Sequence, residues 1–105
     1  MRGDILFNKI KAGKFIDPTH KEAFILRKGE HQVDYVNSSL TLKSKIIWTS
    51  DMDYKLVLED ISNPEIVNLQ VGDELSVHVV EVTNEYYVSE TNYKGNKVVS
   101  QLWFV

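Results

Sequence analysis

Short runs of alternating hydrophobic and polar residues follow one another along the whole chain, and turn-forming residues separate them. In the run 40–49, Leu42, Ile46 and Trp48 occupy even positions, whereas the lysines occupy odd positions. This alternation is typical of a β-strand with one buried face. The complete set of runs covers 13–16, 22–28, 31–36, 40–49, 54–58, 74–82, 86–91 and 96–105.

Most of the connections between these runs are short, which predicts antiparallel strands that are neighbours in chain order. Eight such strands close into a barrel, and closure removes exposed edges. We therefore expect an all-β fold: an eight-stranded antiparallel up-and-down barrel, in a single domain over 1–105, with a short N-terminal helix over 4–13. Asp4 would cap this helix, and Leu6 and Ile10 would share a face. A β-sandwich and a five-stranded OB-type barrel are the alternatives.

Two stretches depart from simple alternation. In 74–82 the apolar positions change phase, which predicts a β-bulge near Val79 and Val80. The stretch 60–73 is apolar at several positions but has no clear period, so it packs onto something. It could form a helical turn, a lid over the mouth of the barrel, or an extra edge strand.

Composition narrows the range of functions. The 105 residues carry a formal net charge of −3, and the lysines are dispersed. Nucleic-acid-binding proteins usually show a basic stripe, so a single-stranded nucleic-acid binder is the least favoured function, and we expect no nucleic-acid partner. The absence of cysteine excludes disulfides and thiolate metal sites. No run approaches the roughly 18 apolar residues of a membrane span.

Catalytic and metal-binding patterns are missing from the sequence. The histidines, His20, His31 and His78, lack the paired spacing of metal ligands. Asp51 and Asp53 have a calcium-like spacing, but the rest of an EF-hand loop does not follow. There is also no Gly-x-Ser-x-Gly motif and no glycine-rich phosphate loop. We therefore expect neither an enzyme nor a cofactor or metal site.

Scattered single residues and short motifs form a pattern over about 10–105: Gly13-Lys14-Phe15, Arg27, Gln32, Trp48, Tyr54-x-Leu56 and Tyr86-Tyr87. In this pattern the sequence resembles small bacterial lipocalin-like (calycin) proteins of unknown function. The resemblance implies a barrel with a ligand cavity and supplies no catalytic residue. In lipocalins the aromatic residue of the first strand packs across the closed bottom of the barrel, often against an arginine late in the chain. This chain has no arginine after Arg27.

The resemblance also bears on location. These relatives usually follow a secretion or lipoprotein leader, so the implied location is periplasmic or membrane-tethered if a leader has been removed. No signal peptide is visible in 1–12, and without a removed leader the expectation is a cytoplasmic protein.

The favoured function is a non-enzymatic binding module for a small apolar or amphipathic ligand, in which burial supplies most of the affinity. The residues expected to line the barrel interior are Phe24, Leu26, Leu42, Ile46, Trp48, Tyr54 and Leu56. The alternative is a filled barrel that acts as a protein-interaction or structural domain, with Tyr87, Trp103 and 60–73 as its contact surface. The volume of the interior distinguishes the two, and the sequence leaves the oligomeric state open.

Overall fold

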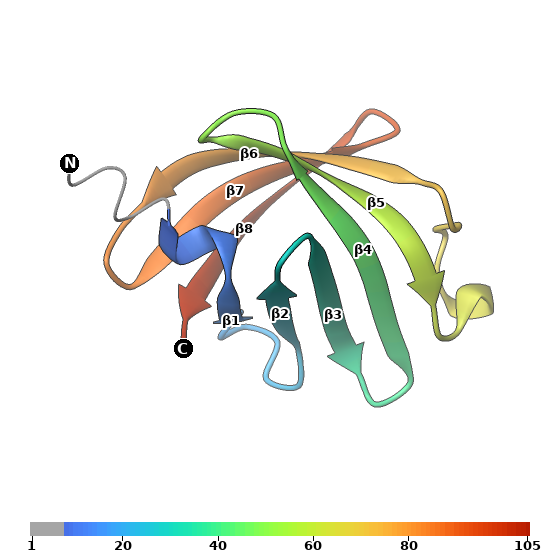
Figure 1. Cartoon of the computed structure of the whole chain (residues 1–105). Coiled ribbons are helices and arrows are strands. Elements are labelled where there is room, and N and C mark those ends of the chain that lie inside the picture. Colours follow the sequence, from blue (N-terminus) through green and yellow to red (C-terminus); the bar gives the residue numbers. More distant parts are fainter. Residues whose placement is uncertain (1–7) are drawn as a thin grey trace.

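The chain folds into a closed barrel of eight antiparallel strands in up-and-down order (Figure 1), as seen in a computed structural model that describes residues 8–105. The all-β barrel prediction is thus confirmed, and the sandwich and the five-stranded barrel are wrong. The strands are β1 (Gly13–Ile16), β2 (Phe24–Lys28), β3 (His31–Asn37), β4 (Leu40–Trp48), β5 (Asp53–Ile61), β6 (Glu74–Val82), β7 (Tyr86–Tyr93) and β8 (Asn96–Phe104).

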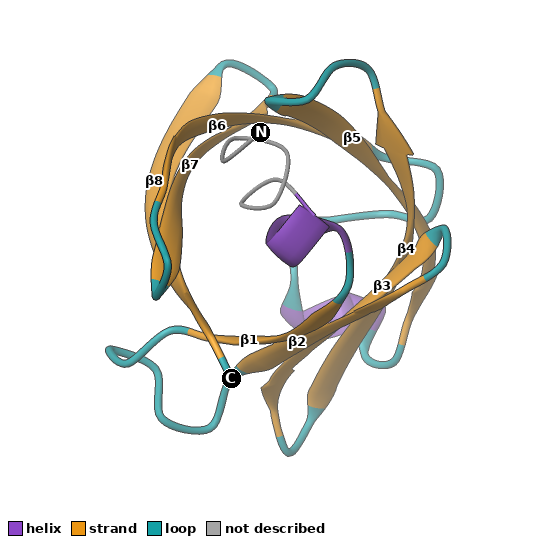
Figure 2. Cartoon of the chain, turned by 60° about the vertical axis from the view of Figure 1, so that its left-hand side comes forward, coloured by secondary structure: helices purple, strands orange, loops and turns teal. Residues whose placement is uncertain are grey.

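The antiparallel order gives the barrel two different ends. The N-terminal helical turn and the connections β2–β3, β4–β5 and β6–β7 lie at one end, which we call the helix end. The longer connections 17–23 and 62–73 lie at the other, the loop end, together with the β3–β4 and β7–β8 turns. Seen along the barrel, the strands form a ring and the helical turn projects inside it (Figure 2).

The helical turn closes the helix end. Residues 8–11 are helical, whereas the predicted cap at Asp4 and the predicted face at Leu6 lie outside the described residues. Ile10 is completely buried and belongs to the main core cluster. Gly13 then adopts a φ of +116°, a conformation that glycine tolerates, and the chain enters β1. Within residues 8–105 no helix is long and apolar enough to cross a membrane.

Two groups of buried side chains fill the interior. The first, larger group lies toward the helix end. The second, smaller group lies nearer the loop end, where Val67 and Leu69 of the β5–β6 connection pack against it. The first group includes Ile10 of the helical turn and fills the interior next to it. The first group consists of Ile10, Phe15, Ile46, Tyr54, Leu56, Val77, Val79 and Tyr87, and the second of Leu40, Leu58 and Ile61.

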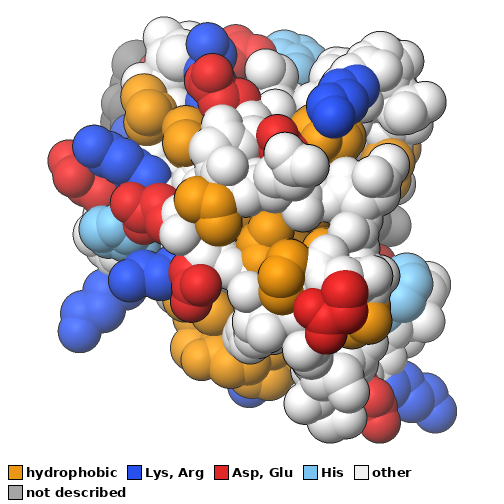
Figure 3. All heavy atoms as spheres, turned by 90° about the vertical axis from the view of Figure 1, so that its right-hand side faces the viewer, with side chains coloured by type: hydrophobic (Ala, Val, Ile, Leu, Met, Phe, Trp, Pro, Cys, Tyr) orange, Lys and Arg blue, Asp and Glu red, His pale blue; other side chains and the backbone are white. Residues whose placement is uncertain are grey.

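The structure agrees in part with the predictions for the two irregular stretches, 74–82 and 60–73. The register of β6 and β7 shifts between Val79 and Glu81, which confirms the predicted bulge. The β5–β6 connection forms one 3₁₀ turn, η1 (Pro64–Ile66), and no extra strand. Hydrophobic side chains gather among acidic ones on the face that carries η1 (Figure 3). Ile66 and Val71 of this connection are each more than half exposed.

The pairing of β1 with β8 closes the ring over a very short length. Only Phe15 with Phe104 and Ile16 with Trp103 are in register, whereas β7 and β8 pair along all eight residues of β7. β8 therefore continues toward the loop end beyond its last pairing with β1. Figure 2 shows β8 meeting β1 close to the C-terminus.

Candidate functional site

A buried arginine forms the floor of the barrel. Arg27 is 2% exposed, and its Nε and Nη2 donate to Oε1 of Gln32 at 3.0 and 2.6 Å. Its Nη1 donates to the carbonyl oxygen of Ile10 in the helical turn. A guanidinium group offers five donors in a fixed plane, which suits several acceptors arranged around it. The arginine thus fixes the helical turn to the strands.

The β2–β3 hairpin places Arg27 next to Gln32. Gly29 has a φ of +59°, and the tight turn at Gly29 and Glu30 puts Arg27 and Gln32 directly opposite each other in the register. Cross-strand partners share a face of the sheet, so both side chains point into the barrel. A glycine at this position therefore determines where the polar floor lies.

Arg27 also completes the aromatic packing at the helix end. Its guanidinium carbon lies 4.7 Å from the centre of the Phe15 ring, within the range of a cation–π contact. The arginine that contacts the aromatic residue of β1 therefore comes from β2. Because Arg27 lies early in the chain, the late position expected from lipocalins does not apply here.

Two tyrosine hydroxyls complete the shell around the arginine. Nη2 of Arg27 lies 3.1 Å from Oη of Tyr87 and 3.4 Å from Oη of Tyr54, and the two hydroxyls are 3.2 Å apart. Burial raises the pKa of Tyr54 well above its usual value, and the neighbouring Tyr87 adds to the effect. Tyr87 is completely buried. The expectation that it forms a contact surface is therefore wrong, because its ring faces the core.

Gln32 links the arginine to a carboxylate. Its Nε2 donates to Oδ1 of Asp34 at 2.7 Å, so the amide accepts from Arg27 on one side and donates to Asp34 on the other. Burial raises the pKa of Asp34, although the Gln32 hydrogen bond and the charge of Arg27 act in the opposite direction. Oδ2 of Asp34 makes no hydrogen bond within residues 8–105. One oxygen of this sheltered carboxyl group is therefore available to a ligand.

Asp34 lines a cavity of about 190 Å³ that is open to solvent on one side. The cavity lies toward the loop end, between β1, β2, β3 and β8, and the loop 17–23 borders it. Its wall is mostly apolar. The lining residues are Phe15, Asp17, His20, Ala23, Phe24, Ile25, Asp34, Tyr35, Val36 and Leu102. The arrangement can hold a small apolar body and offer it polar contacts at Asp34, Asp17 and His20.

A larger depression of about 450 Å³ lies on the β5–β6 connection. It is lined by Ile61, Pro64, Glu65 and residues 67–71, so one segment of the chain supplies nearly all of its wall. Its surface is more polar than that of the cavity at Asp34. Since enclosed apolar sites with a few polar groups are the usual ligand sites, the smaller cavity is the better candidate.

Two of the residues expected in the interior lie on the outer face of β2. Leu26 is 39% exposed, and the Phe24 ring stacks on Tyr35 with 4.4 Å between ring centres. Nζ of Lys14 lies 4.7 Å from the centre of the Phe24 ring. The even positions of β2 face outward because Arg27, at an odd position, is buried. Phe24 still borders the cavity.

The other five expected residues lie inside the barrel but do not border the cavity. Ile46, Tyr54 and Leu56 are buried in the main core cluster, and Trp48 packs against them with its ring 4.7 Å from that of Tyr54. Leu42 packs against the second cluster. The structure thus brings four of the seven together as a filled core, at the opposite end from the space.

Sequence reasoning did not single out Ile25, Asp34 or Leu102 as lining residues. One signal for Asp34 was present. If the Gly29–Glu30 turn pairs Arg27 with Gln32, then Asp34 faces the same side as Gln32, because side chains alternate along a strand. Because this inward position carries a charged residue, the alternation of apolar residues along the strand does not identify it.

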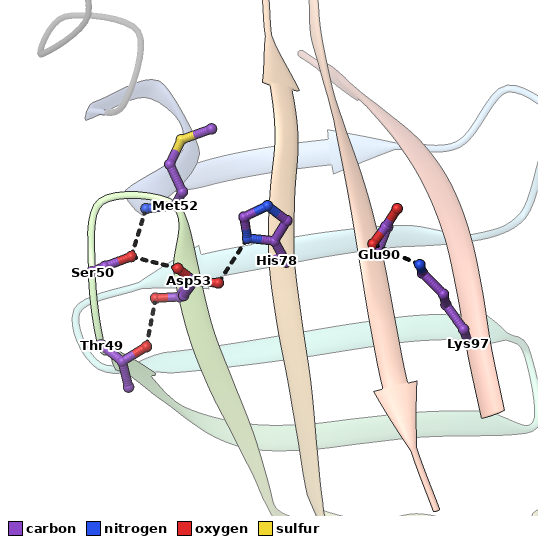
Figure 4. A network of polar contacts seen from close by, with 7 residues as sticks. All are labelled: Thr49, Ser50, Met52, Asp53, His78, Glu90 and Lys97. Carbon is purple, nitrogen blue, oxygen red and sulfur yellow. Dashed lines mark hydrogen bonds and ion pairs between the residues drawn. The ribbon is translucent and has the colours of Figure 1, made fainter. Parts of the chain in front are cut away.

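The histidines each contact one carboxylate on the outer surface. His78 Nδ1 lies 2.8 Å from Oδ1 of Asp53, and beyond it Lys97 Nζ lies 3.0 Å from Oε2 of Glu90 (Figure 4). Hydrogen bonds from Ser50 and then His78 lower the pKa of Asp53. Among residues 8–105 no three His, Asp or Glu side chains gather closely enough to hold a metal ion. This row is best described as a solvated outer face.

Comparisons of the chain with protein-family models, with curated proteins and with solved structures found no match.

Proposed function

We propose that this protein is a non-enzymatic binding module that takes a small amphipathic ligand in the cavity at Asp34. The observation that carries the proposal is the sheltered carboxyl group of Asp34 in a mostly apolar cavity wall, where Gln32 and Arg27 hold it in place. Asp17 and His20 also line this wall, and they hydrogen-bond to each other. Ligand sites commonly combine apolar walls with a few fixed polar groups in this way.

The cavity volume limits the size of the ligand. A cavity of roughly 150 Å³ with apolar walls can hold benzene, so about 190 Å³ fits one ring with a short substituent. Burial of the ring would supply most of the affinity, at roughly 25 cal/mol for each Å² of apolar surface removed from water. Drug-sized ligands require roughly 300 Å³ or more and are too large for this site.

The carboxyl group selects the polar end of the ligand. Oδ2 of Asp34 can accept a hydrogen bond from an amine or a hydroxyl group. An ammonium group would also offset the cost of an ionised carboxylate in a sheltered site. A ligand carboxylate would meet Asp34 with like charge. A small aromatic or aliphatic amine is therefore the preferred class.

A titration with simple probes tests this function. We expect benzylamine to shift the backbone amide resonances of Ile25, Asp34 and Leu102 in NMR spectra, and to bind at least about tenfold more weakly to Asp34→Asn. Benzoate should not bind. Leu26→Ala, on the outer face of β2, serves as the matched control and should leave the affinity unchanged.

A cavity-filling variant adds a second check. Leu102→Phe adds volume at the wall, so it should remove benzylamine binding while the thermal transition remains cooperative. Equal binding to wild type, Asp34→Asn and Leu102→Phe would contradict the proposal. Native mass spectrometry of the purified protein would reveal a ligand that is retained through purification.

A filled barrel that binds another protein is the second candidate. Apolar side chains continue along the outer face from β2 and β3 to β1, where Ile16 pairs with Trp103, and Trp103 packs on Tyr86. Large exposed apolar patches often mark interaction sites. If this face mediates association, Leu26→Lys and Ile16→Lys should both reduce it in analytical ultracentrifugation without affecting benzylamine binding.

A further inference from the structure

β8 has an edge that no other strand covers. Its register with β1 ends at Trp103, and within residues 8–105 no main-chain hydrogen bond joins 96–102 to any segment except β7. The loop 17–23 follows directly after β1 and makes no main-chain bond to β8. The barrel therefore has an open seam between β8 and this loop, from the end of β1 to the loop end.

The direction of the main-chain groups follows from the alternation in an antiparallel ladder. The amide of Val105 donates to the carbonyl of Lys14 on β1, whereas the amide of Phe104 donates toward Glu85 on the β7 side. Odd positions of β8 therefore direct their N–H and C=O groups toward the seam. At Lys97, Val99 and Gln101 these three donors and three acceptors have no main-chain partner.

The side chains along this edge offer little protection against another strand. Native edge strands are commonly shielded by a free lysine, a proline or an inward-pointing charge. Lys97 forms an ion pair with Glu90, which is on the neighbouring strand β7 and thus away from the seam (Figure 4). Val98 and Val99 are 59% and 62% exposed. The edge is therefore both apolar and accessible.

A groove of about 320 Å³ runs along the seam. Residues 98–101 and Trp103 form one wall, and residues 17–20 form the other. Hydrogen bonds within the loop hold that second wall, since Oδ1 of Asp17 accepts from the amide of Thr19 at 2.9 Å and from its hydroxyl at 2.6 Å. The occupant must enter between a strand edge and a loop.

We propose that the seam binds an extended, apolar peptide segment of a partner polypeptide, which adds a strand to β8. A row of unpaired donors and acceptors is recognised by an extended main chain, and exposed valines favour β-branched or other aliphatic side chains on the peptide. Residues 17–20 form the opposite wall, so the groove offers a place for one strand between them and β8. A second barrel would bring two such loops together, so a single extended segment fits better.

This inference rests on the strand edge and not on the cavity at Asp34. None of the residues with free main-chain groups lines that cavity. Asp17 and His20 line both the cavity and the groove, whereas Val99 lines only the groove. A loss of peptide binding in Val99→Pro while benzylamine binding is kept therefore distinguishes the edge from the ligand site.

Hydrogen exchange of the wild-type protein provides the first test. The amides of Lys97, Val99 and Gln101 should exchange much faster than those of Val98 and Ser100, which face β7. Equal protection at Val98 and Val99 would show that the edge is already paired and would overturn the proposal. This measurement needs no variant and no ligand.

Peptide selection provides the second test. A displayed library of random linear twelve-residue peptides is selected on the wild-type protein, and the enriched peptides are synthesised and measured against Val99→Pro and Val99→Thr. Proline removes the seam-facing N–H but no bond to β7, and it is tolerated at such edge positions. Threonine keeps the N–H and is β-branched, so Val99→Thr is the matched control.

We expect enriched peptides to be apolar, to lack proline at the bonded positions, and to slow amide exchange at Val99. Their affinity should fall at least about tenfold in Val99→Pro and stay within about threefold in Val99→Thr. Absence of enrichment, or equal binding to both variants, would overturn the proposal. A wild-type dimer that Val99→Pro dissolves would also overturn it, in favour of a second copy of the chain.

Discussion

Arg27 holds together parts of the chain that are distant in sequence. It donates to Gln32 on β3, to the tyrosines on β5 and β7, and to the carbonyl of Ile10 in the helical turn. None of these partners carries a negative charge, so the interior satisfies the guanidinium with neutral acceptors. The nearest carboxyl group in this network, that of Asp34, is reached only through Gln32. The position of the ligand-facing carboxyl group thus depends on the arginine.

We predict that Arg27→Lys lowers the free energy of unfolding by about 3 kcal/mol. A lysine ammonium has three donors at one point and cannot satisfy acceptors spread around a planar group. Urea denaturation measures the change. Lys28→Gln, on the exposed side of the same strand, should change the free energy by less than about 0.5 kcal/mol. A loss below about 1 kcal/mol for Arg27→Lys would show that the network is not structural.

Asp34 should make stability depend on pH in a defined direction. Burial raises its pKa, so the folded protein holds the proton more tightly than the unfolded chain does. The contribution of Asp34 to stability is therefore complete below about pH 4 and is lost as the pH rises through the folded-state pKa. Asp34→Asn removes this loss, so its stability relative to wild type should increase with pH.

Urea denaturation of wild type and Asp34→Asn at a series of pH values from 3.5 upward tests this direction. Asp60→Asn, on the exposed side of β5, controls for the removal of one carboxylate. If the relative stability of Asp34→Asn is flat or decreases with pH, the carboxyl group does not lie in a sheltered site.

At the level of the strands, regular alternation was the reliable signal. It gave the inward faces of β4 and β5 correctly, because Ile46, Tyr54 and Leu56 are apolar and buried. It gave the wrong face for β2, because the buried position there is the charged Arg27 and the outer positions are apolar. Hydrophobicity could not identify the inward face where a polar network occupies the interior.

Bulges and loops were predictable only where local chemistry marked them. The phase change at Val79 and Val80 revealed the β6 bulge. The extra residue in the β4–β5 pairing is Glu59, and the similar phase change from Leu58 to Ile61 lies beyond the run 54–58 that the sequence predicted. The packing of 62–73 depends on contacts with the second core cluster, which local pattern does not encode. The cavity at Asp34 depends on four strands and could not be inferred from any one of them.

The β7–β8 turn offers a prediction for one element. Lys94 has a φ of +49° and Gly95 a φ of +81°, which is the type I′ geometry that favours Asn-Gly. Lys94→Asn should therefore increase the free energy of unfolding by about 0.5–1 kcal/mol. Thermal and urea denaturation measure the gain. Gly95→Ala should have the opposite effect, and a destabilised Lys94→Asn would contradict this description of the turn.

At the scale of the whole molecule, the barrel is closed by much less pairing than any of its other interfaces. The shortest other interface, β1 with β2, has four residues in register, compared with two for β1 with β8. Opening of the ring should therefore begin at this interface, since few main-chain bonds oppose it. The same short pairing leaves the edge of β8 free. The weak closure of the ring and the accessibility of the β8 edge therefore have one cause.

A disulfide across the closing pair should stabilise the protein. Ile16 and Trp103 are cross-strand partners at a separation that suits a disulfide, and the chain has no other cysteine to compete. The oxidised Ile16→Cys/Trp103→Cys variant should be about 2–4 kcal/mol more stable than its reduced form in urea denaturation. Equal stability of both forms would show that the ring does not open there first.

The closing pair also sets a delay during synthesis. Phe15 and Phe104 are 89 positions apart in sequence, so β1 is translated long before β8, the strand that pairs with its second edge. At about 5–20 residues per second a ribosome needs roughly 4–18 s to cover that distance. During this interval β2 to β7 can assemble while β1 has only one neighbour. Slow codons late in the message would extend this delay and thereby the time for which the nascent sheet stays open at both edges.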